Sequence, residues 1–446
     1  MRIDLTDNNK GQPNAGIFNR KDVSALFSIT DKTIAQLCRE NEKLLIFPYS
    51  IEASEDKIGE ASVMTIGNTC DSEMVRITTG NVMGFVGVGD LQVKIKSRFD
   101  DGRDDYFLHY MLQRVLSLNL FDLNHNDEKE DVFEFIMFMF PCFLKNAMRQ
   151  GIYREYQNFK HNDANVKGVV NLGRHIARNV PFAGNVAYST REYSCDNSMT
   201  ELIRHTIEFM MSRKYGQSVL ELDRETMENV KSIIWHTPSY DKNERKTVIS
   251  KNLRLNRHPY YTAYQPLQSL CLQILRLEEI RYGETDDEIC GILFDGAWLW
   301  EEYVDTILRY EGFTHPRNKM REGSIYLFED KSGIRYPDFY KDGIVLDAKY
   351  KRLGDYNRVA QVGRDDLHQL ITYVANLEAP RGGFIVPLLE KQRGIPQSQL
   401  KHPSSYLFIL GLEICENSNS YADFCRKMRG REQELVEKLR SLQKFA

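Results

Sequence analysis

Two short strand-like runs joined by an Asp-Gly pair constrain most strongly how this chain folds. The runs are residues 334–340 and 343–350, and the pair is Asp342-Gly343. Asp-Gly is favoured in the tight turns of β-hairpins, so the runs are predicted to form two neighbouring antiparallel strands. Residues at matching positions of the two strands are therefore expected to meet at one edge of a sheet.

Two carboxylates and one amine are expected to meet at this hairpin. Side chains alternate between the faces of a strand, so Asp347 and Lys349 point the same way while Ala348 points into the packing. Asp338, near the end of the first run, reaches the same place. Carboxylates are suitable ligands for Mg²⁺, and a lysine beside them positions an attacking water or stabilises charge on a phosphate. The set favours metal-assisted phosphodiester hydrolysis, and a surface hairpin with a cross-strand Asp–Lys pair is the alternative.

The segments that flank the hairpin carry further candidate residues. Upstream, the apolar residues of 299–308 fall on one helical stripe, and Glu301 lies beside that stripe. Downstream, Gln369 and Tyr373 are four residues apart and therefore share one face of a predicted helix. Taken alone, either Glu301 or its neighbour Glu302 favours an ordinary solvated helix face.

The pairs Pro337-Asp338 and Asp347-Ala348-Lys349 resemble the two halves of the motif of the PD-(D/E)XK nuclease superfamily. In that superfamily a helix before the motif strands commonly gives a glutamate to the metal site, which implies Glu301 here. The resemblance implies that Asp338, Asp347 and Glu301 hold Mg²⁺. It also implies that Lys349 positions the water and stabilises the transition state. Gln369 and Tyr373 resemble the Gln-xxx-Tyr element of RecB-type nucleases, which supports the site and contacts DNA.

Blocks outside the hairpin carry a second resemblance. Residues 299–304 read Leu-Trp-Glu-Glu-Tyr-Val, residues 151–156 read Gly-Ile-Tyr-Arg-Glu-Tyr, and residues 91–99 end in Lys-Ser-Arg-Phe. These blocks are similar to Leu-Phe-Glu-x-Tyr-Val, Gly-Leu-x-Arg-x-Tyr and Ile-x-Pro-Lys-Phe of the McrC family, the nuclease subunits of McrBC modification-dependent restriction systems. Ser97 stands where the family has proline, and residues 166–170 lack both arginines of its Arg-Gly-Arg-Ile. The resemblance spans residues 75–390, and no role is transferred to residues 166–170.

The McrC resemblance implies a partner and a division of labour. McrC-like subunits work with a McrB-like AAA+ GTPase hexamer, which is the motor and the reader of modified double-stranded DNA. Their N-terminal domain contacts this ring and stimulates its GTPase activity. The present chain has no Gly-xxxx-Gly-Lys-Ser/Thr phosphate loop, so GTP is expected on the partner and Mg²⁺ is the cofactor expected here.

The overall charge limits how the chain binds DNA. With a formal net charge of −4, the chain is unlike a nonspecific DNA-coating protein, so DNA contacts are expected from local basic groups. Lys351, Arg352 and Arg358 follow the hairpin directly and are predicted to neutralise phosphates. The basic stretch 145–178 is compatible with either DNA contact or a solvated face.

Cysteine usage and hydropathy indicate a cytoplasmic protein without a membrane partner. The chain has 8 cysteines and no Cys-x-x-Cys pair, so a zinc or iron–sulfur site has no local signature. Residues 1–10 are polar and unlike a signal peptide, and the most apolar run, 132–144, is shorter than the ~20 residues of a membrane span. Scattered cysteines without an export signal favour the cytoplasm.

The chain is long enough, at 446 residues, for two or three domains, and the predicted fold class is multidomain α+β. The domains predicted are a β-rich N-terminal domain that docks on the partner ring (1–105), a mainly helical middle domain (106–288) and an α/β PD-(D/E)XK restriction-endonuclease-like domain (289–446). The predicted function is a Mg²⁺-dependent DNA endonuclease subunit of a McrBC-like restriction system. The alternatives are a non-cleaving activator that bridges an AAA+ ring to DNA, and a stand-alone RecB-like repair nuclease.

Overall fold

The computed structural model describes most of the chain, and Asp342 of the predicted turn lies outside the described residues. The described residues are 2–10, 16–41, 44–48, 57–89, 91–100, 105–116, 128–213, 216–221, 223–254, 258–281, 289–316, 323–341, 343–353, 358–392, 394–415 and 418–443. They form two compact units. The first unit combines residues 1–124 with residues 285–446, and the second consists of residues 125–284.

A five-stranded sheet near the N-terminus takes one strand from far along the chain. Its strand order is β1-β7-β6-β11-β3, with β11 parallel to β3 and antiparallel to β6. The strands are β1 (Arg2–Thr6), β3 (Leu44–Phe47), β6 (Val82–Val88), β7 (Leu91–Lys96) and β11 (Ile289–Asp295). The sequence assigns β11 to the C-terminal domain, whereas the structure pairs it inside the N-terminal sheet. The predicted N-terminal and C-terminal domains are therefore not independent, because residues 289–295 belong to the N-terminal sheet.

Glycines let β6 and β11 approach closely. Gly84 has a positive φ of 129°, and a Cβ atom there would lie 2.2 Å from the carbonyl oxygen of Ile292. A Cβ atom on Gly291 would lie 2.3 Å from the carbonyl oxygen of Phe85. A side chain at either position would push the two strands apart, so these glycines fix the pairing.

Smaller elements cover this sheet and complete its core. A second sheet has the order β2-β5-β4, and helix α1 begins with a capping box at Thr33. These elements are β2 (Ile17–Asn19), β4 (Met64–Asn68), β5 (Met74–Thr79) and α1 (Ile34–Glu40), with 3₁₀ helices η1 (Ser24–Ser28) and η2 (Lys57–Glu60). In β7 the inward residues Leu91, Val93 and Ile95 are buried, as their alternation predicts.

The C-terminal sheet carries the predicted hairpin. Its order is β14-β15-β16-β18-β17, with β15, β16 and β18 parallel and the two outer strands antiparallel. The strands are β14 (Phe339–Lys341), β15 (Ile344–Ala348), β16 (Arg381–Leu388), β17 (Gln397–Gln399) and β18 (Tyr406–Glu413). The parallel strands are almost continuously buried, because helices cover both faces of the sheet.

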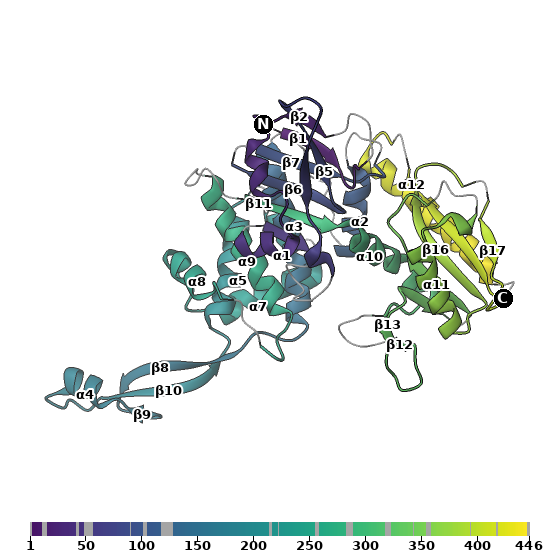
Figure 1. Ribbon diagram of the computed structural model, residues 1–446. Coiled ribbons are helices and arrows are strands. Elements are labelled where there is room, and N and C mark those ends of the chain that lie inside the picture. Colours follow the sequence, from purple (N-terminus) through teal and green to yellow (C-terminus); the bar gives the residue numbers. More distant parts are fainter. Residues whose placement is uncertain are drawn as a thin grey trace. The chain divides into compact units, whose positions relative to one another are not determined.

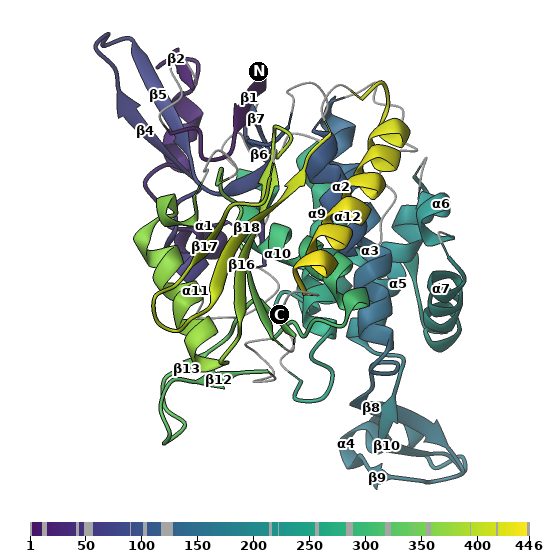
Figure 2. The ribbon, with the colours of Figure 1, turned by 90° about the vertical axis from the view of Figure 1, so that its right-hand side faces the viewer.

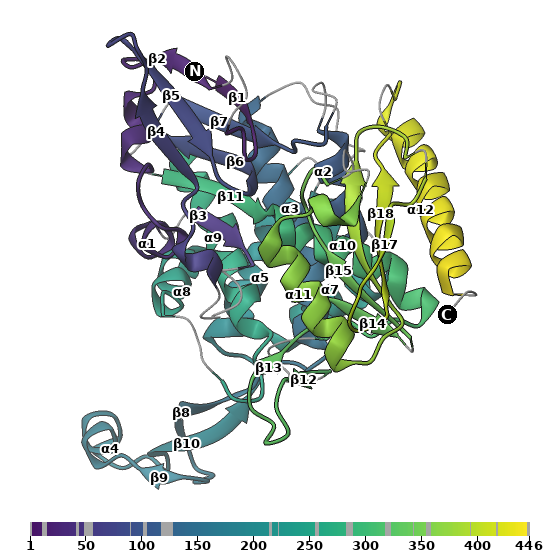
Figure 3. The same cartoon turned by 45° about the vertical axis from the view of Figure 1, so that its right-hand side comes forward.

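Helices α11 and α12 lie on opposite faces of this sheet (Figure 2, Figure 3). α11 packs on β15 and β16, and α12 packs on β18. Helix α10 contacts β15, and α2 packs against both α10 and α12. The helices are α2 (Tyr106–Leu116), α10 (Gly296–Leu308), α11 (Arg364–Asn376) and α12 (Tyr421–Gln443), with 3₁₀ helices η4 (Arg309–Glu311) and η6 (Val359–Gln361).

The first predicted strand of the hairpin is divided in the structure. Residues 334–340 are not one strand: β13 (Ile334–Arg335) pairs with β12 (Ile325–Tyr326), and β14 begins only at Phe339. Pro337 lies between them, and proline has no N–H group to donate to a strand ladder. The antiparallel pairing of β14 with β15 is as the sequence predicts.

The second unit is a helical bundle with a β-arm. Figure 1 shows the arm, made of β8, β9, β10 and α4, extending away from the helices of this unit. The helices are α3 (Glu128–Met148), α5 (Ser198–Met211), α6 (Gly216–Leu220), α7 (Arg224–His236), η3 (Lys242–Glu244), α8 (Arg245–Lys251) and α9 (Tyr264–Arg281). The arm consists of β8 (Glu155–Asp163), β9 (Val169–Val170), α4 (Leu172–Asn179) and β10 (Val186–Ser194). Within the described residues, no helix has the length and hydropathy of a membrane span.

Candidate functional site

The β14–β15 hairpin brings the three predicted motif residues together. Phe339 pairs with Leu346, so continuing the register by one residue places Asp338 opposite Asp347. The Nζ atom of Lys349 lies 2.8 Å from Oδ2 of Asp347. The tight turn and the strand alternation thus produce the cluster of two acids and one amine that the sequence predicts.

Asp338 is fixed through both its side chain and its backbone. Its Oδ2 accepts a hydrogen bond of 2.7 Å from the backbone N–H of Ala348, which anchors it to β15. Its backbone carbonyl accepts a hydrogen bond of 2.7 Å from Nδ1 of His315. Burial raises the pKa of Asp338, and the ammonium of Lys349 opposes this shift.

Asp347 is a fully buried carboxylate, and its Oδ2 forms an ion pair of 2.8 Å with Nζ of Lys349. Burial raises its pKa to about 8, the adjacent Asp338 adds to the rise, and Lys349 opposes it. Burying a carboxylate is costly, and two carboxylates side by side repel each other when both are ionised. A positive charge between Asp338 and Asp347 would relieve both costs.

Lys349 is held in place by the downstream helix. Burial alone lowers its pKa, but Asp347 and then Asp338 more than offset this, so the pKa is raised and the amine stays protonated. Its Nζ donates to Oε1 of Gln369 at 3.2 Å. Nε2 of Gln369 donates to Oη of Tyr373 at 2.9 Å, and that hydroxyl donates to the carbonyl of Tyr336 at 3.1 Å. Gln369 and Tyr373 therefore link the lysine to the segment that precedes Asp338.

Glu301 lies on helix α10, which is anchored at its start and along its length. Asp295 caps the helix by accepting a hydrogen bond of 2.8 Å from the N–H of Trp298. Nε1 of Trp300 donates to the carbonyl of Ile385 in β16 at 3.2 Å. Burial raises the pKa of Glu301 well above its usual range, and Asp338 is the next largest cause. The helix therefore places Glu301 close enough to Asp338 and Asp347 for their negative charges to raise its pKa.

His315 is a site residue that the sequence analysis misses. Its Nε2 lies 3.8 Å from Oε1 of Glu301 and 4.0 Å from Oε1 of Glu302, and its ring stacks on Phe339 at 4.8 Å. Burial lowers its pKa, but the carboxylate of Glu302 and the carbonyl of Asp338 raise it by more, to a net value of about 9. It bridges α10 and the hairpin.

The signal for His315 is not local. An isolated β-bridge between Thr314 and Tyr340 brings it beside β14, and no spacing in the sequence announces this contact.

The three basic residues that follow the hairpin have different surroundings. Lys351 forms an ion pair of 2.6 Å with Asp366, and Arg352 donates a hydrogen bond of 3.0 Å to the carbonyl of Arg98. Arg358 is exposed. Of the three predicted DNA contacts, two are thus already engaged with protein groups, and all three stay predictions.

The donor set fits a hard cation with few protein ligands. No group of three or more His, Cys, Asp or Glu residues arranged to hold a metal occurs in the described part of the chain. Mg²⁺, however, usually keeps several waters and takes one or two carboxylates. Asp338 and Asp347 supply those carboxylates, and the register of the hairpin places them opposite each other.

Comparison with known proteins identifies one family. The sequence profile of the McrBC 5-methylcytosine restriction system component matches residues 77–387. Two similar solved structures come from Thermococcus gammatolerans, each at 14% identity. The first is a half-complex of McrB AAA+ hexamers with bound McrC (TM-score 0.48, 96% of this chain and 100% of that chain covered). The second is the McrBC complex (TM-score 0.33, 72% and 90% covered). No curated protein matches the chain.

Proposed function

The chain belongs to the family of McrBC 5-methylcytosine restriction system components, and from this premise we propose that it is the Mg²⁺-dependent DNA endonuclease subunit of a McrBC-like system. The observation that carries the proposal is the pair of facing acids, Asp338 and Asp347, with Lys349 Nζ 2.8 Å from Asp347. A mixed sheet covered by helices on both faces presents this set, which supports assignment to the PD-(D/E)XK superfamily.

Each residue of the set has a role that follows from its surroundings. Asp338 and Asp347 would hold Mg²⁺, and Glu301 would assist from α10. Bound there, the ion would supply an activated water and neutralise charge on the scissile phosphate. Lys349 stays protonated between two acids, so it donates hydrogen bonds and positive charge to the phosphate as negative charge develops. Gln369 keeps the ammonium in place, with Tyr373 holding Gln369 in turn.

The proposed partner is a McrB-like AAA+ GTPase ring. The family description names one component of a multi-component 5-methylcytosine restriction system, and this chain has no phosphate-loop motif of its own. GTP would therefore be bound by the partner, and residues 1–105 would dock on the ring. The DNA substrate would be double-stranded and modified. Lys351, Arg352 and Arg358 remain the proposed phosphate contacts next to the site.

The test is cleavage of methylated duplex DNA by the chain together with a partner ring, GTP and Mg²⁺. We expect the wild-type chain to cut, and Asp347→Asn and Lys349→Ala each to lower the rate at least about a hundredfold, as loss of a transition-state charge contact does. The control is Asp423→Asn, which removes an acid on the far helix α12. Undiminished cutting by the double variant Asp347→Ala, Lys349→Ala would refute the proposal.

The same assay separates the two rival functions. If the chain is a non-cleaving activator, the wild type will stimulate the GTPase of the ring but leave DNA intact with every divalent cation tested. A stand-alone repair nuclease would degrade DNA ends without the ring or GTP. Both outcomes are distinct from partner-dependent cutting that is lost in Asp347→Asn.

A further inference from the structure

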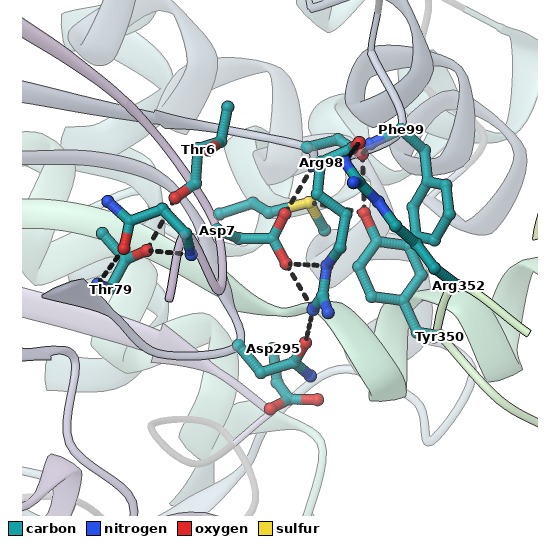
Figure 4. Close-up of polar contacts among 12 residues, drawn as sticks. Thr6, Asp7, Thr79, Arg98, Phe99, Asp295, Tyr350 and Arg352 are labelled. Carbon is teal, nitrogen blue, oxygen red and sulfur yellow. Dashed lines mark hydrogen bonds and ion pairs between the residues drawn. The ribbon is translucent and has the colours of Figure 1, made fainter. Parts of the chain in front are cut away.

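A buried contact joins the end of β7 to the residue directly after Lys349. Tyr350 is buried, and its hydroxyl shares a hydrogen bond of 2.6 Å with Oγ of Ser97. The guanidinium of Arg98 lies 4.9 Å from the centroid of the Tyr350 ring (Figure 4). Ser97 and Arg98 follow β7 of the N-terminal sheet, so this sheet touches the residue next to the motif lysine.

The guanidinium of Arg98 is itself fixed by the first strand of the chain. Its Nε donates to Oδ2 of Asp7 at 2.8 Å, and its backbone N–H donates to Oδ1 at 2.6 Å (Figure 4). Asp7 follows β1 directly and is fully buried. The carbonyl oxygen of Arg98 accepts a hydrogen bond of 3.0 Å from Arg352. Arg98 is therefore held from both the N-terminal sheet and the segment after the hairpin.

The residues around Arg98 and Tyr350 also determine where helix α10 begins. The N–H of Gly296 donates to the carbonyl of Asn81 at 2.8 Å, and the side chain of Asn81 also accepts from Arg98. A Cβ atom on Gly296 would lie 2.9 Å from two carbons of the Tyr350 ring. The helix that carries Glu301 thus begins directly against Tyr350, and only glycine fits there.

One carbonyl group aligns this helix with the motif lysine. The carbonyl of Ile385 in β16 accepts the backbone N–H of Lys349 at 2.9 Å and Nε1 of Trp300 at 3.2 Å. Trp300 precedes Glu301 in α10. A displacement of Tyr350 would therefore move Lys349 through the chain and Glu301 through the helix start.

We propose that Ser97, Arg98 and Tyr350 are positioning residues through which the N-terminal sheet sets the geometry of the cleavage site. The inference rests on the proposed function, because it concerns how that same site is regulated. Ring docking on the N-terminal residues then reaches Lys349 through Tyr350, without any contact between the ring and the site. A partner-dependent nuclease needs such a link, since uncontrolled cutting would damage host DNA.

The first experiment needs neither metal nor DNA. Hydrogen–deuterium exchange is followed in the wild-type chain, in Tyr350→Phe and in Ser97→Ala. We expect amides of residues 344–353 to exchange about fivefold faster in both variants, as local opening follows loss of one buried hydrogen bond. Amides of β18 should be unaffected. Equal exchange in the wild type and in both variants would overturn the inference.

A matched control separates positioning from general loosening. Tyr110→Phe also removes one buried tyrosine hydroxyl, which joins α2 to α12 by donating to Glu432 at 2.9 Å. We expect this variant to leave exchange of residues 344–353 at the wild-type rate. Faster exchange there in Tyr110→Phe, as large as in Tyr350→Phe, would reduce the contact to an ordinary part of the core.

The second experiment measures cutting with the ring, GTP and Mg²⁺. We expect Tyr350→Phe and Ser97→Ala to lower kcat about tenfold or more, because small misplacement of reacting groups is costly, while KM for DNA and stimulation of the GTPase stay unchanged. The double variant should be no slower than either single variant, since both remove one shared hydrogen bond. The inference would be overturned if the losses in kcat of the two single variants added up in the double variant. It would also be overturned if Tyr350→Phe and Ser97→Ala cut DNA as fast as Tyr110→Phe. If the wild type itself does not cut, the proposed function fails, and the exchange experiment still decides the link.

Discussion

At the scale of single residues, Asp347 is the group whose surroundings most need a cation. Burial, and then Asp338, raise its pKa to about 8. A carboxyl with a higher pKa in the folded than in the unfolded chain makes folding less favourable as pH rises, because the folded state gives up its proton later. For Asp347 the loss of stability starts above the ordinary pKa of about 4 and is complete above pH 8.

Replacing Asp347 therefore has a pH-dependent effect on the metal-free protein. We expect Asp347→Asn to raise the melting temperature in EDTA, and to raise it more at pH 8 than at pH 5. The amide has the size of the carboxylate without its charge, so the gain at pH 8 is on the order of 1–3 kcal/mol. In the control Asp423→Asn, hydrogen bonds from Lys427 and Arg426 lower the carboxyl pKa to about 2, so stability should fall instead. A lower melting temperature of Asp347→Asn at pH 8 would contradict this account.

His315 tests how far the site depends on a residue that does not touch the proposed metal. Asparagine places an N–H donor near the position of Nδ1 and can still bind the carbonyl of Asp338, whereas glutamine places its donor near Nε2. We expect His315→Gln to raise the Mg²⁺ concentration for half-maximal cutting about tenfold or more, as loss of a supporting hydrogen bond does, and His315→Asn to change it little. Mg²⁺ titration of the cleavage rate measures both. The same half-saturation point in the two variants would count against a supporting role.

At the scale of elements, what the sequence predicts correctly is local. Turn chemistry and strand alternation are enough to pair Phe339–Lys341 with Ile344–Ala348 and to bring Asp347 next to Lys349. Helical spacing is likewise enough to place Gln369 and Tyr373 on one face, where they bond to each other. Each of these features depends on residues fewer than ten apart in the chain.

The elements that the sequence does not predict depend on distant or unusual partners. The strand β11 reads as the start of a C-terminal domain, because an apolar run does not reveal which sheet will accept it. The arm strand β8 alternates between exposed and half-buried residues and has no fully buried face, so its period-two apolar signal is weak. His315 reaches the site only through the bridge between Thr314 and Tyr340.

At the scale of the whole molecule, the first unit is built from both ends of the chain. Buried Glu432 in α12 accepts hydrogen bonds from Tyr303 in α10 at 2.7 Å and from Tyr110 in α2 at 2.9 Å. The ring of Tyr303 also lies edge-on to Phe107. The C-terminal sheet and its helices therefore complete their core with residues from before position 124.

This shared core determines which fragments fold. We expect residues 289–446 alone to show no cooperative thermal unfolding, and coexpression with residues 1–124 to restore it. The isolated fragment 289–446 lacks Phe107, on which Trp300 and Tyr303 pack, and Phe99, on which Tyr350 packs. Exposing each large apolar side chain costs about 1.5–3 kcal/mol, and three of them amount to much of the roughly 5–15 kcal/mol that stabilises a domain.

The second unit provides the matched fragment. Residues 125–284 bury their helices against one another, so we expect them to unfold cooperatively without the rest of the chain. Calorimetry of the three samples under identical conditions checks both expectations. A melting transition for residues 289–446 that stays the same when residues 1–124 are added would mean that the C-terminal sheet is independent. The N-terminal sheet would then not fix the position of Tyr350, and regulation through the contact of Tyr350 with Ser97 and Arg98 would lose its structural basis.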